Sequence, residues 1–205
     1  MEIENSESIL RNSTRKLVER YEVGLLWKDP NYQLPNSRPQ ALGRLTALKR
    51  RLSVDMKLKE AYQSEIDSLV QNGIAKKEVA SETDSRKGRA WYLPHHGVRS
   101  VAKPDKLRVV FDDSAVFNGI SLNNMLSKGP PLLSDLCHLL IRFRRYQIAV
   151  AADVDHMFLQ VAVSQSDQTV IRFLWRNSSH KPLRTYQMTR QVFGLTSAQL
   201  LASTL

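Results

Sequence analysis

The segment from Ala149 to Val161 constrains this chain most, because an apolar run ends in a carboxylate and an aromatic residue follows five positions later. The run predicts a β-strand with Asp153 at its end. A carboxylate at a rigid strand end is well placed to bind a cation such as Mg²⁺. A strand-end aspartate also commonly caps a turn or accepts hydrogen bonds from nearby backbone N–H groups. This segment alone leaves both interpretations open.

The charge of the chain points to a polyanionic partner. The sequence has 30 Lys and Arg against 20 Asp and Glu, which gives a formal net charge of +10. Such an excess favours nucleic acid as a partner, although it can also serve solubility alone. With 205 residues, of which 42% are hydrophobic, the chain is long enough to bury a core in one large or two small domains.

The cysteine content and hydropathy indicate an intracellular protein. The single cysteine, Cys137, excludes an intrachain disulfide and a cysteine-based zinc cluster, and fits a reducing compartment. The sequence shows no apolar stretch of about 18 residues and no charged start followed by an apolar core. We therefore expect a soluble protein, located in the cytoplasm, without a membrane partner.

The first part of the sequence is mainly helical in pattern. Residues 1–20 are polar and predict a lead-in or short helix without a core of its own. Leucines recur at helical spacing after Pro39, beside a basic face. The predicted elements are an edge strand at 21–26, a helix at 39–52, a second helix at 55–69 that stops at Asn72-Gly73, and an exposed loop or flexible hairpin at 76–89.

From residue 89 onward the pattern changes to strands, which predicts an α+β fold. A hairpin is expected from Trp91 to Phe111, with its turn at Lys103–Lys106. A short helix begins at Ser121, and an amphipathic helix is predicted from Leu132 to Tyr146. Further short strands are predicted at 161–163, 170–175 and 185–188.

Five motifs follow one another along the chain: Trp91-Tyr92-Leu93-Pro94-His95-His96, Lys103 to Asp112, the Asp153 segment, Arg172 to Arg176, and Val192-Phe193-Gly194-Leu195-Thr196-Ser197. In this order they resemble the reverse transcriptases, in particular those of Pao/BEL-type LTR retrotransposons. The resemblance covers nearly all residues after about 20. It implies a partial right-hand polymerase with a fingers-like part at about 21–131 and a partial palm at about 132–205.

The resemblance assigns nucleotide-binding roles to the fingers-like hairpin. Arg108 resembles the arginine that contacts the triphosphate of the incoming nucleotide, a task that suits a permanently charged, bidentate guanidinium. Lys103 and Lys106 are expected to assist, although either can equally be a solvated loop lysine. Asp112 resembles a carboxylate near the nucleotide pocket, and a turn-forming role is the alternative.

In the palm-like part, Asp153 resembles the first metal-binding and catalytic aspartate, and Val154 offers the adjacent backbone carbonyl. Asp155 is interpreted as a surface or turn carboxylate. Phe158 resembles the aromatic residue that excludes a 2′-hydroxyl and so selects deoxyribonucleotides, with an ordinary core residue as the alternative.

The segment at Phe193 and Gly194 resembles the lining of the nucleotide pocket, where glycine lets backbone approach a ligand closely. Relatives usually have proline near the end of this segment, where this chain has Gln199. We therefore expect Phe193 and Gly194 to contact nucleotide, and the following turn to differ from that of relatives.

The second metal-binding element of the resembled family, a Tyr-x-Asp-Asp hairpin, does not occur before Leu205. Two-metal phosphoryl transfer needs that second carboxylate set. We expect a fragment whose full-length relative is an RNA-directed DNA polymerase using Mg²⁺, template-primer and deoxynucleoside triphosphates, and which is inactive in isolation. In the complete element its partners would include the remainder of the polyprotein, in a virus-like particle. The alternative is a non-enzymatic nucleic-acid-binding remnant.

Overall fold

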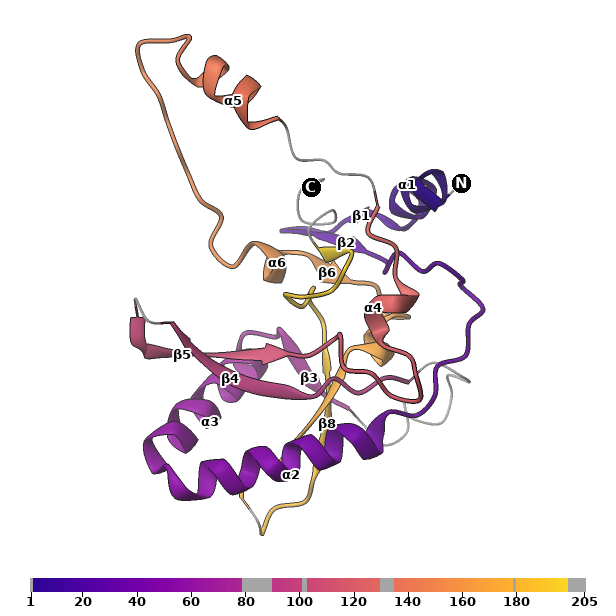
Figure 1. Cartoon of the computed structure of the whole chain (residues 1–205), viewed down its shortest axis with the longest axis vertical. Coiled ribbons are helices and arrows are strands. Elements are labelled where there is room, and N and C mark those ends of the chain that lie inside the picture. Colours follow the sequence, from indigo (N-terminus) through magenta and orange to yellow (C-terminus); the bar gives the residue numbers. More distant parts are fainter. Residues whose placement is uncertain (1, 79–89, 101–102, 130–134, 179, 199–205) are drawn as a thin grey trace.

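The computed structural model of this chain describes residues 2–78, 90–100, 103–129, 135–178 and 180–198. These residues form a mixed α+β fold with three small sheets (Figure 1). The helices are α1 (Glu2–Ser13), α2 (Arg38–Val54), α3 (Met56–Gln71), α4 (Leu122–Met125), α5 (Leu136–Phe143), α6 (Met157–Gln160) and the 3₁₀ helix η2 (Gln168–Val170). The strands are β1 (Arg15–Lys16), β2 (Tyr21–Val23), β3 (Ala75–Lys77), β4 (His95–Ser100), β5 (Lys103–Phe111), β6 (Ala162–Val163), β7 (Arg172–Trp175) and β8 (Arg184–Met188).

Helices α2 and α3 lie where the leucine spacing predicts them. Pro39 occupies the first turn of α2, where its missing N–H costs nothing. The Asp55 side chain caps α3 by accepting a hydrogen bond from the backbone N–H of Leu58 at 2.9 Å. After α3, Gly73 adopts a φ of +64°, the left-handed conformation that ends many helices. Both helices place their buried side chains against the main core.

The hairpin of β4 and β5 corrects the turn predicted at Lys103–Lys106. These residues belong to β5, because the antiparallel ladder continues past Leu107 to pair Ser100 with Lys103. A register shift between Arg99 and Ser100 accommodates this extension. Pairing satisfies backbone N–H and C=O groups that a turn would leave to solvent, and it outweighs the local turn tendency of Pro104.

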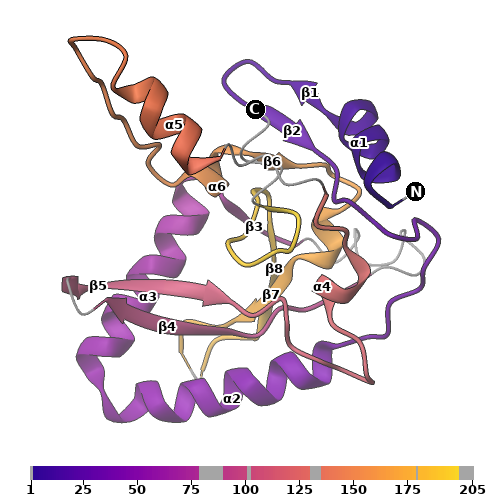
Figure 2. The same ribbon diagram turned by 45° about the horizontal axis from the view of Figure 1, so that its top comes forward.

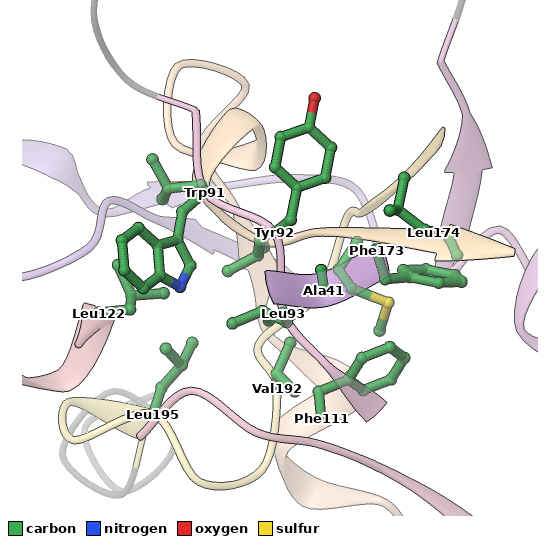
Figure 3. Close-up of a cluster of buried hydrophobic side chains, with 14 of the residues drawn as sticks. Ala41, Trp91, Tyr92, Leu93, Phe111, Leu122, Phe173, Leu174, Val192 and Leu195 are labelled. Atoms are coloured by element: carbon green, nitrogen blue, oxygen red, sulfur yellow. The ribbon is translucent and has the colours of Figure 1, made fainter. Parts of the chain in front are cut away.

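The larger of two apolar clusters joins segments that are far apart in the sequence. Figure 3 shows part of this cluster, in which residues 91–93 meet side chains from α4, β5, β7 and the segment at 192–195. His95 belongs to the core as well. Its Nε2 donates to the Leu174 carbonyl at 3.0 Å, and the Tyr62 hydroxyl donates to its Nδ1 at 2.5 Å. Burial lowers the pKa of His95 to about 4, so this imidazole is neutral at physiological pH.

The N-terminal region contributes to a second, smaller apolar cluster. Leu10 of α1 is buried together with Val23, Leu26 and Val161. The strand predicted at 21–26 is shorter and is not an edge strand, because β2 pairs with β1 on one side and in parallel with β6 on the other. The parallel pairing to β6, about 140 residues away, is a long-range contact that local patterning does not reveal.

The segment around α5 differs most from prediction. Residues 132–134 of the predicted helix lie outside the described part of the chain, and α5 ends at Phe143 rather than Tyr146. The predicted strand before Asp153 does not form, because a lone strand has no neighbour to satisfy its backbone hydrogen bonds. In Figures 1 and 2, α5 and the chain after it stand away from the rest. No helix in the described ranges is both long and apolar enough to cross a membrane.

Candidate functional site

Two aromatic residues from separate motifs meet in the structure. Phe158 on α6 and Phe193 have ring centroids 5.3 Å apart in an edge-to-face arrangement with an interplanar angle of 69°. Phe158 is half-buried against the main core, whereas Phe193 is 66% exposed. The core therefore fixes the position of Phe158, and Phe193 presents a largely open ring beside it.

Gly194 brings backbone against a buried carboxylate. Its φ is +111°, a conformation that L side chains rarely adopt. A Cβ at this position would lie 3.0 Å from Asp113 Oδ2 and 3.1 Å from Oδ1. The close approach that the structure shows is to the carboxylate of Asp113. Contact with a nucleotide stays a prediction.

Asn123 of α4 links the two segments. Its Nδ2 donates to Asp113 Oδ1 at 3.2 Å and to the Gly194 carbonyl at 3.0 Å. Its Oδ1 accepts from the backbone N–H of Thr196 at 2.7 Å. One amide side chain therefore holds the turn after Phe193 in register with the end of β5. The sequence did not identify Asn123 or Asp113 as residues of the site. The only sequence signal for Asp113 is its position next to Asp112, which was predicted to lie near the nucleotide pocket.

The Asp113 carboxyl is the most perturbed acid of this site. It is 4% exposed, and its Oδ2 has no hydrogen-bond partner among the described residues. Burial raises the pKa of Asp113 to about 7, with a further rise from the charge of Asp112, while the hydrogen bond from Asn123 acts in the opposite direction. Near neutral pH this group can exist in either protonation state, so it can donate or accept a hydrogen bond.

An open pocket of about 440 Å³ adjoins this cluster. Two lysines, amides and hydroxyls lie around it, which favours a polar, negatively charged ligand. Asn123 and Thr196 belong to both the pocket and the Asp113 cluster. The lining residues are Lys28, Asn123, Asn124, Leu126, Ser127, Lys128, Gly129 and Thr196.

The residues of the fingers-like hairpin that were predicted to bind nucleotide differ in their surroundings. Asp112 forms an ion pair with Arg44 of α2 at 3.3 Å and accepts a hydrogen bond from the Ser114 hydroxyl at 2.9 Å. Arg108 and Lys106 are exposed on β5. The side chain of Lys103 lies outside the described part of the structure, as does Gln199. The structure thus ties Asp112 to α2 and leaves Arg108 open to solvent.

Asp153 and Val154 are both exposed, in a segment without regular secondary structure. Oδ1 of the neighbouring Asp155 lies 3.7 Å from Nε2 of His156. The backbone carbonyl of Asp155 accepts a hydrogen bond from the Gln160 side chain. Within the described ranges, no group of three or more His, Cys, Asp or Glu side chains could hold a metal ion. The residues present therefore do not form a Mg²⁺ site by themselves, since one exposed carboxylate fixes too few of the ligands that this ion needs.

Comparison with known proteins gives weak structural likeness only. No protein-family model and no curated protein sequence matches this chain. Among solved structures, it is similar to a foamy viral protease-reverse transcriptase in complex with double-stranded DNA. The sequence identity is 17% and the TM-score is 0.45, over 73% of this chain and 21% of the viral one. This chain thus spans about a fifth of that protein, and a likeness at this level leaves its family unassigned.

Proposed function

We propose that this chain is the fingers and part of the palm of a reverse transcriptase from a Pao/BEL-type LTR retrotransposon. The observation that carries the proposal is the convergence of three sequence motifs in one place. Asp113 just after β5, the aromatic Phe158 and the turn at Phe193-Gly194 come from positions up to 81 residues apart. They lie in mutual contact or share Asn123. Each belongs to or adjoins a motif that the resemblance assigns to the nucleotide pocket.

In this proposal the aromatic pair shapes the sugar side of a deoxynucleotide site. Phe158 packs against the core and against the ring of Phe193, so its ring can exclude a 2′-hydroxyl without reorganising. Gly194 lets backbone approach the ligand. The exposed Arg108, assisted by Lys103 and Lys106, would contact the phosphates, and Asp112 would hold the hairpin to α2 through Arg44.

The reaction proposed for the full-length relative is attack of a primer 3′-hydroxyl on the α-phosphate of a template-selected deoxynucleotide. Asp153 and Val154 would supply part of the Mg²⁺ site. Because the described residues contain no second carboxylate set beside Asp153, we propose that the isolated chain has no appreciable polymerase activity. We propose that the complete protein is located in the cytoplasm, in a virus-like particle with the rest of the polyprotein.

A primer-extension assay tests the absence of activity. The purified 205-residue chain is incubated with a primed RNA template, deoxynucleoside triphosphates and Mg²⁺, beside the variant Asp153→Asn. The expected result is salt-sensitive binding of the template-primer without extension, in both proteins. Extension by the wild type that disappears in Asp153→Asn would show that the isolated chain is active.

The second candidate function is nucleic-acid binding without catalysis. It is favoured by the exposed arginines Arg142, Arg144 and Arg145 at the end of α5, which lie outside the Phe158 and Phe193 cluster. It predicts binding that falls with salt and does not depend on Asp153 or Phe158. Loss of binding in a folded Asp153→Asn protein would argue against this candidate.

A further inference from the structure

The turn end of the β7–β8 hairpin meets α2 and α3 at a corner of the molecule that the proposed polymerase site does not use. In Figures 1 and 2 this end of the hairpin lies at α2. Lys49 of α2 places its Nζ 3.3 Å from the centroid of the Trp175 ring and donates a hydrogen bond to the Arg176 carbonyl at 2.6 Å. The ammonium is therefore fixed above an aromatic face rather than free in solvent.

The aromatic support beneath Lys49 is rigid. Trp175 is 1% exposed and stacks on Tyr62, with ring centroids 5.1 Å apart and an interplanar angle of 21°. Its indole N–H donates to Gln63 Oε1 of α3 at 3.2 Å. Because the ring is covered, it cannot stack on a ligand, and only the cationic groups around it are accessible.

Two further cations lie around Lys49. Arg176 follows the end of β7, and Lys59 comes from α3. Burial lowers the pKa of Lys49 to about 8, and repulsion by the charges of Arg176 and Lys59 adds to this effect. At neutral pH Lys49 still carries its proton, so three positive charges are gathered at this corner.

These charges have no counter-ion among the residues that the structure describes. In the part of the chain that the structure describes, none of Lys49, Lys59 and Arg176 forms an ion pair with a carboxylate. Lys49 uses one of its three donors on the Arg176 carbonyl. Gathered like charges repel one another, and a bound anion that pairs with all three removes that repulsion.

We propose that Lys49, Lys59 and Arg176 form a binding site for a phosphate group. A phosphate carries several acceptor oxygens, which suits a site with one preoriented ammonium, a second ammonium and one guanidinium. The group can come from a nucleic-acid backbone or from a free phosphate. This site shares no residue with the Phe158 and Phe193 cluster, so it can be tested independently of the proposed function.

The test uses charge reversal at the two members of the corner other than Lys49, Lys59→Glu with Arg176→Glu. A matched control is Arg51→Glu, which is exposed and lies two residues from Lys49, so it projects from the opposite side of α2. One arm measures binding of a fluorescent RNA–DNA duplex by anisotropy over a range of salt concentrations. The other arm titrates inorganic phosphate and follows the indole N–H signal of Trp175 by NMR, because this group lies directly under Lys49.

For a backbone phosphate, the double variant should bind the duplex about tenfold more weakly, and the slope of log affinity against log salt should shrink by about two. Arg51→Glu should affect both quantities less. For a free phosphate, the wild-type indole signal should shift saturably while the double variant does not respond, and duplex binding should be unchanged. If the double variant matches Arg51→Glu in both arms, the proposal is wrong. Should charge reversal prevent folding, Lys59→Gln with Arg176→Gln gives the same comparison without introducing acids.

Discussion

Replacement of Asp113 by asparagine should change how the stability of the protein depends on pH. In the folded protein the pKa of Asp113 is about 7, against an ordinary value of 3.8, because burial disfavours the charged carboxylate. Between pH 3.8 and about pH 7, the Asp113 carboxyl is protonated in the folded chain and ionised in the unfolded chain. The free energy of unfolding therefore contains a favourable contribution at low pH that is lost as the pH rises through about 7.

The size of this effect follows from the shift. A carboxyl pKa raised to about 7 lowers the free energy of unfolding by about 4 kcal/mol between acid and mildly alkaline pH. Asparagine does not ionise, and its amide can occupy the place of the unpartnered Oδ2. We expect Asp113→Asn and wild type to have similar free energies of unfolding near pH 4, and the variant to be the more stable protein at pH 8.

Urea unfolding followed by tryptophan fluorescence, at constant ionic strength from pH 4 to pH 8, measures this difference directly. The control Asp155→Asn removes the same charge from a side chain that is 93% exposed, and should stay within about 0.5 kcal/mol of wild type at each pH. Parallel pH profiles for Asp113→Asn and wild type would refute the account of Asp113 as a buried acid.

Two further predictions concern backbone space and buried charge. Gly194→Ala should reduce the free energy of unfolding by about 2–4 kcal/mol, because φ at this position is +111° and the new Cβ meets the Asp113 carboxylate. Gly43→Ala should instead raise the free energy of unfolding by about 0.5–1 kcal/mol, because Gly43 lies on α2 with open space around it. Urea titrations of both variants check this order, and equal effects would contradict it. Arg172→Met should destabilise the fold by about 3–5 kcal/mol, because it removes the ion partner of the buried Glu78. The Glu78 side chain is 4% exposed, and its Oε1 lies 2.5 Å from Nη2 of Arg172. A thermal unfolding temperature unchanged from wild type would contradict this second prediction.

The elements that sequence reasoning predicted well are those with local signals. The spacing of leucines, Pro39 and the Asn72-Gly73 stop define α2 and α3, and the apolar run before Asp112 defines the inner part of β5. Ser121 was also expected to begin a short helix, and its side chain accepts from the N–H of Asn124 at 3.3 Å. In each case the information lies within a few residues.

The prediction failed where long-range pairing decides the structure. The run before Asp153 has the composition of a strand but no pairing partner, so it does not form one. From the sequence, Asn123 has no role beyond the short helix expected to begin at Ser121, because its bonds to Gly194 and Thr196 cross more than 70 residues. Composition also gave no sign that Asp113 rather than Asp112 is the buried acid, since burial depends on the packing of Gly194 against it.

The proposed function requires Phe158, Phe193 and Gly194 to line a deoxynucleotide site. An NMR titration can test this in the chain bound to a primed template, first with a deoxynucleoside triphosphate and then with the matching ribonucleotide. The ring signals of Phe158 and Phe193 and the Gly194 amide should shift with the deoxynucleotide and respond less to the ribonucleotide, and Phe158→Ala should remove this distinction. If the signals of all three residues stay unchanged at nucleotide concentrations that shift other parts of the chain, these residues do not line a nucleotide site.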